Sequence, residues 1–344
     1  MAASSCLFAI LSCGRNHAKL SSSVVNLCNV AYEPKYKKDD HAYRNVNSWK
    51  SKRELADHIV DNLILNRDGL LVFNKPYGVG VSPVPTSSKA LEILPKSYGY
   101  NLHDVLPYLG NSLGIDRLIV AKSSGKFTSG VLIMATSDKA FDRFKTCQRR
   151  ERPAKKLTSK YLGVVMGEPL NENISESVKV ALTSSPDGKT LQPIIYGNKK
   201  PALAKDAISV AAECRTLCTN GHGASLVEIK SNTTKWHFLR VYMAHKLAPL
   251  LGDDMYGSRV KYVAGLPVAM NPFNIHSRST VSISPSIRTR LGLEEGEEIT
   301  IPCHLHLQEY TFLGWNRDGS DLTVNAPIPS FFDWTCKQLN LINY

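Results

Sequence analysis

A chain of 344 residues that is 43% apolar and 21% charged can build a large folded core, and these proportions exclude a wholly disordered or collagen-like protein. The formal net charge is +12, and half of that excess lies in residues 1–53, which hold nine Lys or Arg against three Asp or Glu. No apolar run approaches the roughly 18 residues that a membrane span needs, so we expect no membrane span.

The first 32 residues have the composition of a targeting signal. They contain no Asp or Glu, carry Arg15 and Lys19, and are rich in serine, which is typical of a mitochondrial transit peptide. We therefore predict a transit peptide over residues 1–32 and a location in the mitochondrial matrix, with a disordered tail as the second interpretation. A secretory signal is disfavoured because the apolar stretch over residues 6–11 is short and no positive charge precedes it. Residues 33–66 are expected to form a linker and a short helix.

From residue 51 onwards, apolar spacing and turn residues predict short helices and strands. Leu55, Ile59 and Leu63 recur every four residues behind Ser51, a favourable cap, so a helix is expected over residues 51–65. Other helices are expected over residues 89–96, 101–109 and 137–149, and strands over residues 70–73, 118–121, 131–135, 161–166, 226–229, 238–241, 281–283 and 310–313. Because these elements alternate irregularly, we predict an α+β fold with a mixed, largely antiparallel sheet and flanking helices.

Residues 145–160 are strongly basic and contain a single acid, Glu151. Their polar content and Pro153 predict an exposed loop or arm. Such a loop either pairs with RNA phosphates, which requires no reading of base sequence, or is simply a solvated charged surface. The basic residues are Lys145, Arg149, Arg150, Arg152, Lys155, Lys156 and Lys160.

The cysteines and histidines show no spacing typical of a metal site or a disulfide framework. The eight Cys include no C-x-x-C pair, so reduced thiols are expected, Cys214 and Cys218 among them. His304 and His306 have no further ligand in register, which favours packing over metal binding. We therefore expect no metal site.

Four segments carry the most informative pattern. They are residues 68–83 (DGLLVFNKPYGVGVSP), 122–135 (KSSGKFTSGVLIMA), 160–167 (KYLGVVMG) and 235–257 (KWHFLRVYMAHKLAPLLGDDMYG), followed by short matches at residues 305–306 and 326–329. In this order, they resemble the RluA family of RNA pseudouridine synthases. The positions that fall on family motif residues are Asn74, Lys75, Pro76, Thr128, Ser129, Gly130, Tyr161, His237, Arg240, Gly252 and Asp253.

The resemblance implies a pseudouridine synthase fold with a central cleft over residues 67–333 and a C-terminal tail over residues 334–344. It implies isomerisation of uridine to pseudouridine in RNA without a cofactor, on a base that is unstacked and turned into a pocket. In the family an Asp reacts, an Arg pairs with that Asp, and a Tyr stacks on the base, so Tyr161 and Arg240 match two of these roles. The implied partner is mitochondrial rRNA or mRNA.

The second segment departs from the family pattern. Lys122, Ser123, Ser124 and Gly125 stand where the family has His, Arg, Leu and Asp, so the position of the nucleophile is Gly125. Glycine has no side chain that can act as a nucleophile or a base. Since a buried guanidinium without a partner is costly, we expect Arg240 to meet an RNA phosphate or a local acid instead. Two functions stay open: an RNA-modifying enzyme with an altered route, and an inactive RNA-binding factor that works with RNA-granule or ribosome-assembly proteins.

Overall fold

The computed structural model describes residues 41–44, 46–81, 99–169, 172–273 and 283–341, without the side chain of Arg152. All of these residues belong to one compact unit, Tyr36–Tyr344. The expected transit peptide, the helix expected over residues 89–96 and most of the strand expected over residues 281–283 lie outside the described residues.

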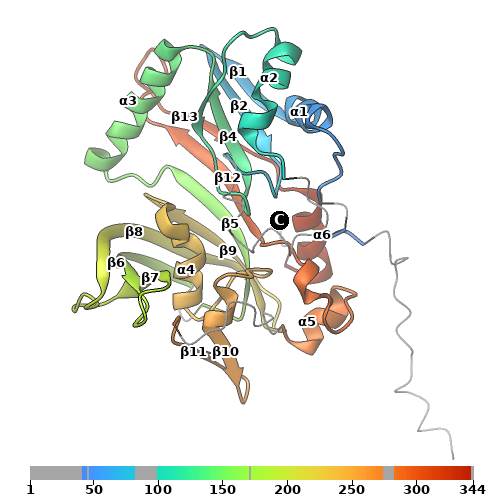
Figure 1. Ribbon diagram of the computed structural model, residues 1–344, viewed down its shortest axis with the longest axis vertical. Helices are drawn as coiled ribbons and strands as arrows, with labels where there is room; N and C mark the ends of the chain where they lie inside the picture. The colour runs from blue at the N-terminus through green and yellow to red at the C-terminus, as the bar shows by residue number, and fades with distance from the viewer. Residues whose placement is uncertain (1–40, 45, 82–98, 170–171, 274–282, 342–344) are drawn as a thin grey trace, which may run out of the picture. The chain divides into compact units, whose positions relative to one another are not determined.

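Eleven strands join in one sheet (Figure 1). They are β1 (Leu63–Arg67), β2 (Leu70–Lys75), β3 (Ile119–Lys122), β4 (Ser129–Ala135), β5 (Ser159–Met166), β6 (Asn173–Ser184), β7 (Leu191–Tyr196), β8 (Ala204–Thr219), β9 (Ala224–Ser231), β12 (Leu305–Phe312) and β13 (Leu322–Asn325). Their order is β1-β2-β4-β12-β5-β9-β8-β6-β7, with β3 beside β4 and β13 beside β12. The pair of β4 and β12 is parallel, whereas the other pairs described in this sheet are antiparallel. This confirms the predicted mixed, largely antiparallel sheet.

The other elements are helices and one separate hairpin. The helices are α1 (Lys52–Asp61), α2 (Leu102–Leu113), α3 (Asp138–Ala154), α4 (Phe238–His245), α5 (Pro285–Arg290) and α6 (Ser330–Gln338), with the short 3-10 turns η4 (Lys235–His237), η5 (Gly257–Arg259) and η6 (Glu297–Thr300). The hairpin consists of β10 (Val260–Val263) and β11 (Leu266–Ala269). No helix in the described part of the chain is long and apolar enough to cross a membrane.

Both faces of the sheet are buried around β2 and β4. Leu71 and Phe73 of β2 pack on one face with residues of α1 and α2, whereas Leu70 and Val72 pack on the other face with Phe144 of α3. Figure 1 shows α1 and α2 on one side of these strands and α3 on the other. Since alternate side chains of a strand point to opposite faces, burial on both faces explains why these strands are continuously apolar in the sequence.

The predicted cap of α1 is confirmed, but the predicted helix is too long. The side-chain oxygen of Ser51 accepts a hydrogen bond from the backbone N–H of Glu54 at 3.1 Å, as an N-cap does. The helix ends at Asp61, and Leu63–Arg67 forms β1 instead. Asp68 and Gly69 both have positive φ, which turns the chain back so that β1 pairs with β2.

Parts of the expected linker and the expected C-terminal tail pack with the sheet unit. Tyr43 is buried, and its hydroxyl lies 2.8 Å from Oγ1 of Thr335 in α6. Helix α6 continues across residue 334, and its Cys336 is buried, as is Leu339 beyond the helix. These interactions connect the two ends of the described chain to one core.

The long strands β6 and β8 were not expected from the sequence. Along the first part of β6, buried or half-buried positions alternate with exposed ones, and the exposed residues include Glu172 before the strand and Ser175, Ser177 and Lys179 within it. One face of these strands is therefore polar, so no apolar run marks them. Polar and apolar residues alternate along these strands, but this alternation identifies β6 and β8 as strands only once their partner strands are known.

The strand expected over residues 238–241 is wrong, because these residues begin the helix α4. Every residue from Phe238 to Ala244 is buried, so the helix has no polar face to reveal its period. In a short segment that is buried on all sides, here with Arg240 as its one charged residue before His245, strand and helix patterns cannot be told apart. The rings of Phe238 and Tyr242, one helical turn apart, stack with centroids 5.3 Å apart.

The loop expected over residues 145–160 is also wrong for most of its length. Helix α3 continues to Ala154, with Pro153 in its last turn, and β5 begins at Ser159. Only the short connection between these two elements is irregular. The basic residues of this stretch therefore belong to α3, to the short connection after it and, for Lys160, to β5, rather than to a free arm.

Candidate functional site

The first and second sequence segments are held together by a buried lysine. Nζ of Lys75, at the end of β2, donates to the backbone oxygens of Val79 at 2.8 Å, of Pro76 at 3.2 Å and of Gly125 at 3.3 Å. The backbone N–H of Gly78 donates to the oxygen of Lys126 at 2.9 Å, which adds a second connection. These bonds fix the turn that follows β2 against the loop that contains Gly125.

Lys75 has no exposed surface, and its three partners are neutral carbonyls. Burial disfavours the charged form and lowers the pKa of the Lys75 amine to about 7. Beside it, Nδ2 of Asn74 donates to the backbone oxygen of Pro327 at 2.8 Å. The N-K-P segment, which ends with Pro76, is thus a structural junction.

Gly125 is exposed, and a Cβ atom placed on it would meet nothing within 4 Å. Its φ lies outside the left-handed region, so the backbone does not require glycine here. Its carbonyl oxygen accepts from the N–H of Thr128 at 3.1 Å, which closes the turn. A larger side chain at position 125 would therefore fit.

Gly130, in contrast, is required by its surroundings. Its φ is +110°, and a Cβ atom would lie 2.1 Å from the carbonyl oxygen of Leu307 on β12. The neighbouring Ser129 places its Oγ 2.9 Å from Nδ1 of His306. The T-S-G motif therefore allows the close parallel approach of β4 and β12.

Arg240, on α4, forms the centre of the candidate site. It is only 4% exposed, and its Nη2 donates to Oδ1 of Asp253 and, at 3.0 Å, to Oδ1 of Asp254. Burial lowers the pKa of the guanidinium, but the charge of Asp253 outweighs it, so the pKa lies well above its usual value. The expectation that Arg240 meets a local acid is therefore confirmed.

The two carboxylates beside Arg240 differ in their surroundings. Asp253 has no exposed surface, and its Oδ1 also accepts from the backbone N–H groups of Met255 at 3.0 Å and Tyr256 at 2.9 Å. Gly252, just before it, has a φ of +75°, and a Cβ there would lie 2.2 Å from the oxygen of Pro302. The side chain of Asp254 is 50% exposed. Asp253 therefore holds the turn, whereas Asp254 reaches solvent.

Aromatic rings from two segments face the guanidinium, and a ring from a third segment packs against one of them. Cζ of Arg240 lies 5.6 Å from the ring centre of Phe127 and 5.4 Å from that of Tyr256. The rings of Tyr77 and Phe127 are 6.2 Å apart. We call the set of Tyr77, Phe127, Arg240, Asp253, Asp254 and Tyr256 the Arg240 cluster; it unites the first, second and fourth segments.

The turn before α4 adds His237 to the rim of this cluster. Trp236 and His237 both have a φ of 56°, which non-glycine residues adopt rarely. Nδ1 of His237 lies 2.8 Å from the hydroxyl of Tyr256. Burial and the nearby Arg240 lower the pKa of His237, which keeps the ring neutral at physiological pH.

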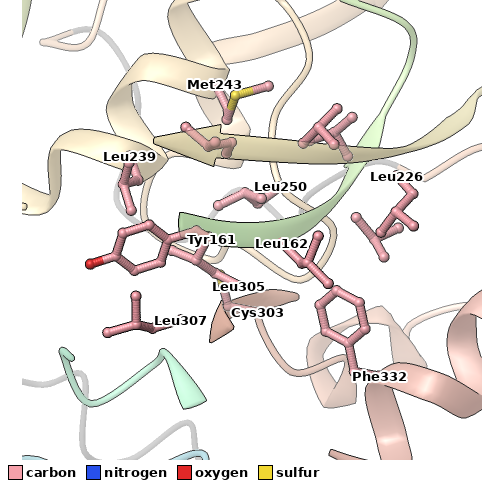
Figure 2. Close-up of a cluster of buried hydrophobic side chains, with 14 of the residues drawn as sticks. Tyr161, Leu162, Leu226, Leu239, Met243, Leu250, Cys303, Leu305, Leu307 and Phe332 are labelled. Atoms are coloured by element: carbon pink, nitrogen blue, oxygen red, sulfur yellow. The ribbon is translucent and has the colours of Figure 1, made fainter. Parts of the chain in front are cut away.

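Tyr161 is 2% exposed and belongs to the buried core around β5. It pairs with Leu307 of β12 and with Ile229 of β9. Figure 2 shows its ring in the same cluster as Leu239 and Leu307, with the hydroxyl group pointing away from the cluster. Burial raises the pKa of the Tyr161 phenol, so the hydroxyl stays protonated and the side chain is neutral.

Most of the expected RNA-binding residues have partners within the protein. Lys145 lies 3.6 Å from Asp142, Lys156 lies 3.1 Å from Asp321, and Lys160 lies 2.7 Å from Glu309. Arg150 donates to the backbone oxygens of Leu313 and Gly314. Within the described residues, Arg149 and Lys155 are exposed and take part in no ion pair. The side chain of Arg152 lies outside the description.

His306 in β12 and His304 just before this strand are both buried and hydrogen-bonded. Nε2 of His304 lies 2.8 Å from Oγ1 of Thr335, and Nε2 of His306 lies 3.1 Å from the oxygen of Ala326. Burial lowers the pKa of both rings to about 4. This geometry agrees with the packing interpretation. Cys214 and Cys218 are both free thiols, but the expectation that both are buried holds only for Cys214, because Cys218 is half-buried.

Sequence reasoning missed Asp254, Phe127 and Tyr77. Asp254 stands at an unspecified position of the fourth segment, and its neighbour Asp253 carries the motif. The only signal was a second carboxylate close in sequence to a motif residue.

The fold and the Arg240 cluster define an α+β protein in which several sequence-distant segments converge on one buried arginine. Comparison with known proteins identifies the class: residues 69–245 match the RNA pseudouridylate synthase family, so the chain belongs to this family. The extension of that domain to residue 333 and the central cleft stay predictions.

Individual relatives point the same way. The chain is 27% identical to Mitochondrial mRNA pseudouridine synthase RPUSD3 of Homo sapiens over 293 residues, which is 85% of this chain and 79% of that protein. It is 25% identical to RNA pseudouridine synthase 4, mitochondrial, of Arabidopsis thaliana, over 79% of this chain and 58% of that protein. The solved structure of Human RNA Pseudouridylate Synthase Domain Containing 4 superposes with a TM-score of 0.62 at 20% identity, over 84% of this chain and 97% of the other, and therefore supports the fold.

Proposed function

We propose that this chain is imported into the mitochondrial matrix by residues 1–32, binds mitochondrial mRNA or rRNA, and isomerises uridine to pseudouridine without a cofactor. Membership of the RNA pseudouridylate synthase family supports RNA as the substrate. Relatives that are named as mitochondrial enzymes support the location and the class of RNA.

The observation that carries the proposal is the composition of the Arg240 cluster. Although position 125 has no side chain, the cluster keeps a buried guanidinium that is paired with carboxylates and surrounded by aromatic rings. A nearby carboxylate can accept a proton from a uracil ring, and a fixed cation can stabilise negative charge that develops on the ring. Gly125 leaves room beside the loop, and the exposed Arg149 and Lys155 extend a positive surface towards RNA phosphates.

A second candidate function is RNA binding without catalysis, as a factor in mitochondrial RNA granules or ribosome assembly. Gly125 favours it, because the position that resembles the family's reacting Asp offers neither a nucleophile nor a base. The aromatic and basic groups would then hold RNA without changing it.

The test uses the purified chain and a mitochondrial RNA pool that carries tritium at C5 of uridine. Pseudouridine formation replaces the C5–H bond by a C5–C1′ bond, so it releases the label to water. We expect label release in a single turnover by the unaltered chain, with a Gly125→Asp variant as the positive comparison.

The outcomes separate the two candidates. Release by the unaltered chain supports the enzyme. Release by Gly125→Asp alone, with RNA bound equally by both, contradicts catalysis and supports the binding factor. If neither protein binds RNA, both candidate functions are wrong.

A further inference from the structure

Arg240 holds two carboxylates on the same nitrogen, and only one of them reaches solvent. Asp253 is fully buried and accepts two backbone N–H bonds in addition to the guanidinium. Asp254 lies 3.0 Å from Nη2 of Arg240 and keeps half of its side chain exposed. An arriving nucleotide can therefore touch Asp254 but not Asp253.

We propose that Asp254 is a catalytic residue, which supplies the carboxylate that position 125 lacks. This assignment rests on the proposed enzymatic function and names the group that would perform it. The loop that contains Gly125 also contains Phe127, whose ring faces the guanidinium of Arg240. Two segments thus contact Arg240. One contains Gly125, beside which there is open space, and the other contributes the exposed carboxylate of Asp254.

The isomerisation needs a proton acceptor and no oxidant or reductant. The N1–C1′ bond breaks with its electron pair on the uracil ring, and C5 then bonds to C1′. The proton on C5 leaves to a base, its electron pair restores the ring double bond, and N1 takes up a proton from water. The Asp254 carboxylate accepts the C5 proton and returns it to solvent, so atoms and charge balance.

Two buried polar atoms of Arg240 and Asp253 also distinguish this pair from an ordinary structural ion pair. Nε of Arg240 and Oδ2 of Asp253 are buried and have no hydrogen-bond partner among the described residues. Groups of this kind are rare in native proteins and often mark a functional site. Glu151 is less suitable as the reacting carboxylate, because its Oε1 already accepts from the hydroxyls of Thr158 and Tyr310 at 2.8 Å.

The test replaces the carboxylate in the full chain and measures single-turnover tritium release together with RNA affinity. We expect Asp254→Asn to lower the rate by about 100-fold or more, the range for loss of a general base, while the Kd for RNA changes less than about threefold. Asp57→Asn on the exposed face of α1 is the matched control and is expected to keep the full rate. Asp254→Ser repeats the test with a smaller side chain, in case the asparagine variant does not fold.

A rescue experiment separates catalysis from a structural role. Adding Gly125→Asp to Asp254→Asn is expected to restore the rate at least tenfold, because a carboxylate then stands on the loop whose Phe127 ring faces the same guanidinium. If the rate of Asp254→Asn is within threefold of the rate of the unaltered chain, Asp254 is not the catalytic residue, whereas the proposed enzymatic function still holds. If the unaltered chain releases no label, the proposed function and this assignment both fall, and the Gly125→Asp variant shows whether the rest of the cluster can support the reaction.

Discussion

The amine of Lys75 lies 3.3 Å from the backbone oxygen of Gly125, fifty positions further along the chain, and donates a hydrogen bond to it. This bond joins the turn after β2 to the loop at which the family's reacting residue is expected. A buried amine in this position must either lose its proton or accept the cost of burying a charge. The Lys75 amine therefore links the shape of the loop to pH.

Replacing Lys75 by methionine tests this link. The folded-state pKa of about 7 is lower than the ordinary value of 10.5, so the unfolded chain binds more protons between these two values. The free energy of unfolding of the unaltered chain, relative to Lys75→Met, should rise by about 1.4 kcal/mol per pH unit above pH 7. Urea unfolding of both proteins at pH 6.5, 8 and 9.5 measures the difference. The exposed control, Lys199→Met, should show no such slope.

The pair of carboxylates beside Arg240 predicts two different stability effects. Asp253→Asn leaves a buried guanidinium with a weaker partner and should cost about 3–5 kcal/mol of unfolding free energy. Asp254→Asn removes a half-exposed ion pair and should cost less than about 1 kcal/mol. Urea unfolding at pH 7 compares them. Equal costs would contradict the distinction between a structural and a solvent-facing carboxylate.

Two glycines of the second segment should respond oppositely to the same substitution. Gly130→Ala forces a Cβ to within 2.1 Å of the oxygen of Leu307 and should lower the Tm strongly or prevent folding. Gly125→Ala places a Cβ in open space and should change the Tm by no more than about 2 °C. Thermal unfolding followed by circular dichroism measures both. A stable Gly130→Ala protein would argue against the close approach of β4 and β12.

His304 and His306 should make the protein sensitive to mild acid. Their folded-state pKa of about 4 is below the ordinary value of 6.5, so they contribute stability above pH 6.5 that is lost as the pH falls towards 4. As the pH falls through this window, the free energy of unfolding should decrease in both proteins. The decrease should be smaller for His306→Gln than for the unaltered chain, by about 1.4 kcal/mol per pH unit. Unfolding between pH 7 and 4.5 tests this, with the exposed His222→Gln as the control. Parallel curves for all three proteins would contradict it.

The exposed basic residues at the end of α3 should contribute to RNA affinity without base specificity. Arg149→Ala with Lys155→Ala should weaken binding equally for different RNA sequences and reduce the slope of log affinity against log salt by about 0.7 for each phosphate that is no longer neutralised. Lys156→Ala with Lys160→Ala is the matched control, because these lysines already pair with Asp321 and Glu309. Filter binding from low to high salt measures both slopes. An affinity that does not change with salt would refute phosphate pairing.

Local sequence patterns were sufficient to predict secondary structure where residues close together in the chain determine it. The cap at Ser51 and the apolar runs of β2 and β4 depend on neighbours in the chain, and their predictions are confirmed. The polar strands β6 and β8 and the helix α4 were missed or misassigned. In these segments, burial and pairing by distant segments decide the structure, and no short window of sequence records those interactions.

The sequence by itself determined the mixed sheet, the family and the residue type at position 125. Only the tertiary structure decided what surrounds Arg240, because its carboxylate and aromatic neighbours come from segments far apart in the chain. It also decided that most of the basic stretch is helical and that four of its lysine and arginine side chains are bound by the protein itself. Residue identity states which charges exist, whereas the distances created by folding determine which of them neutralise each other and which remain exposed.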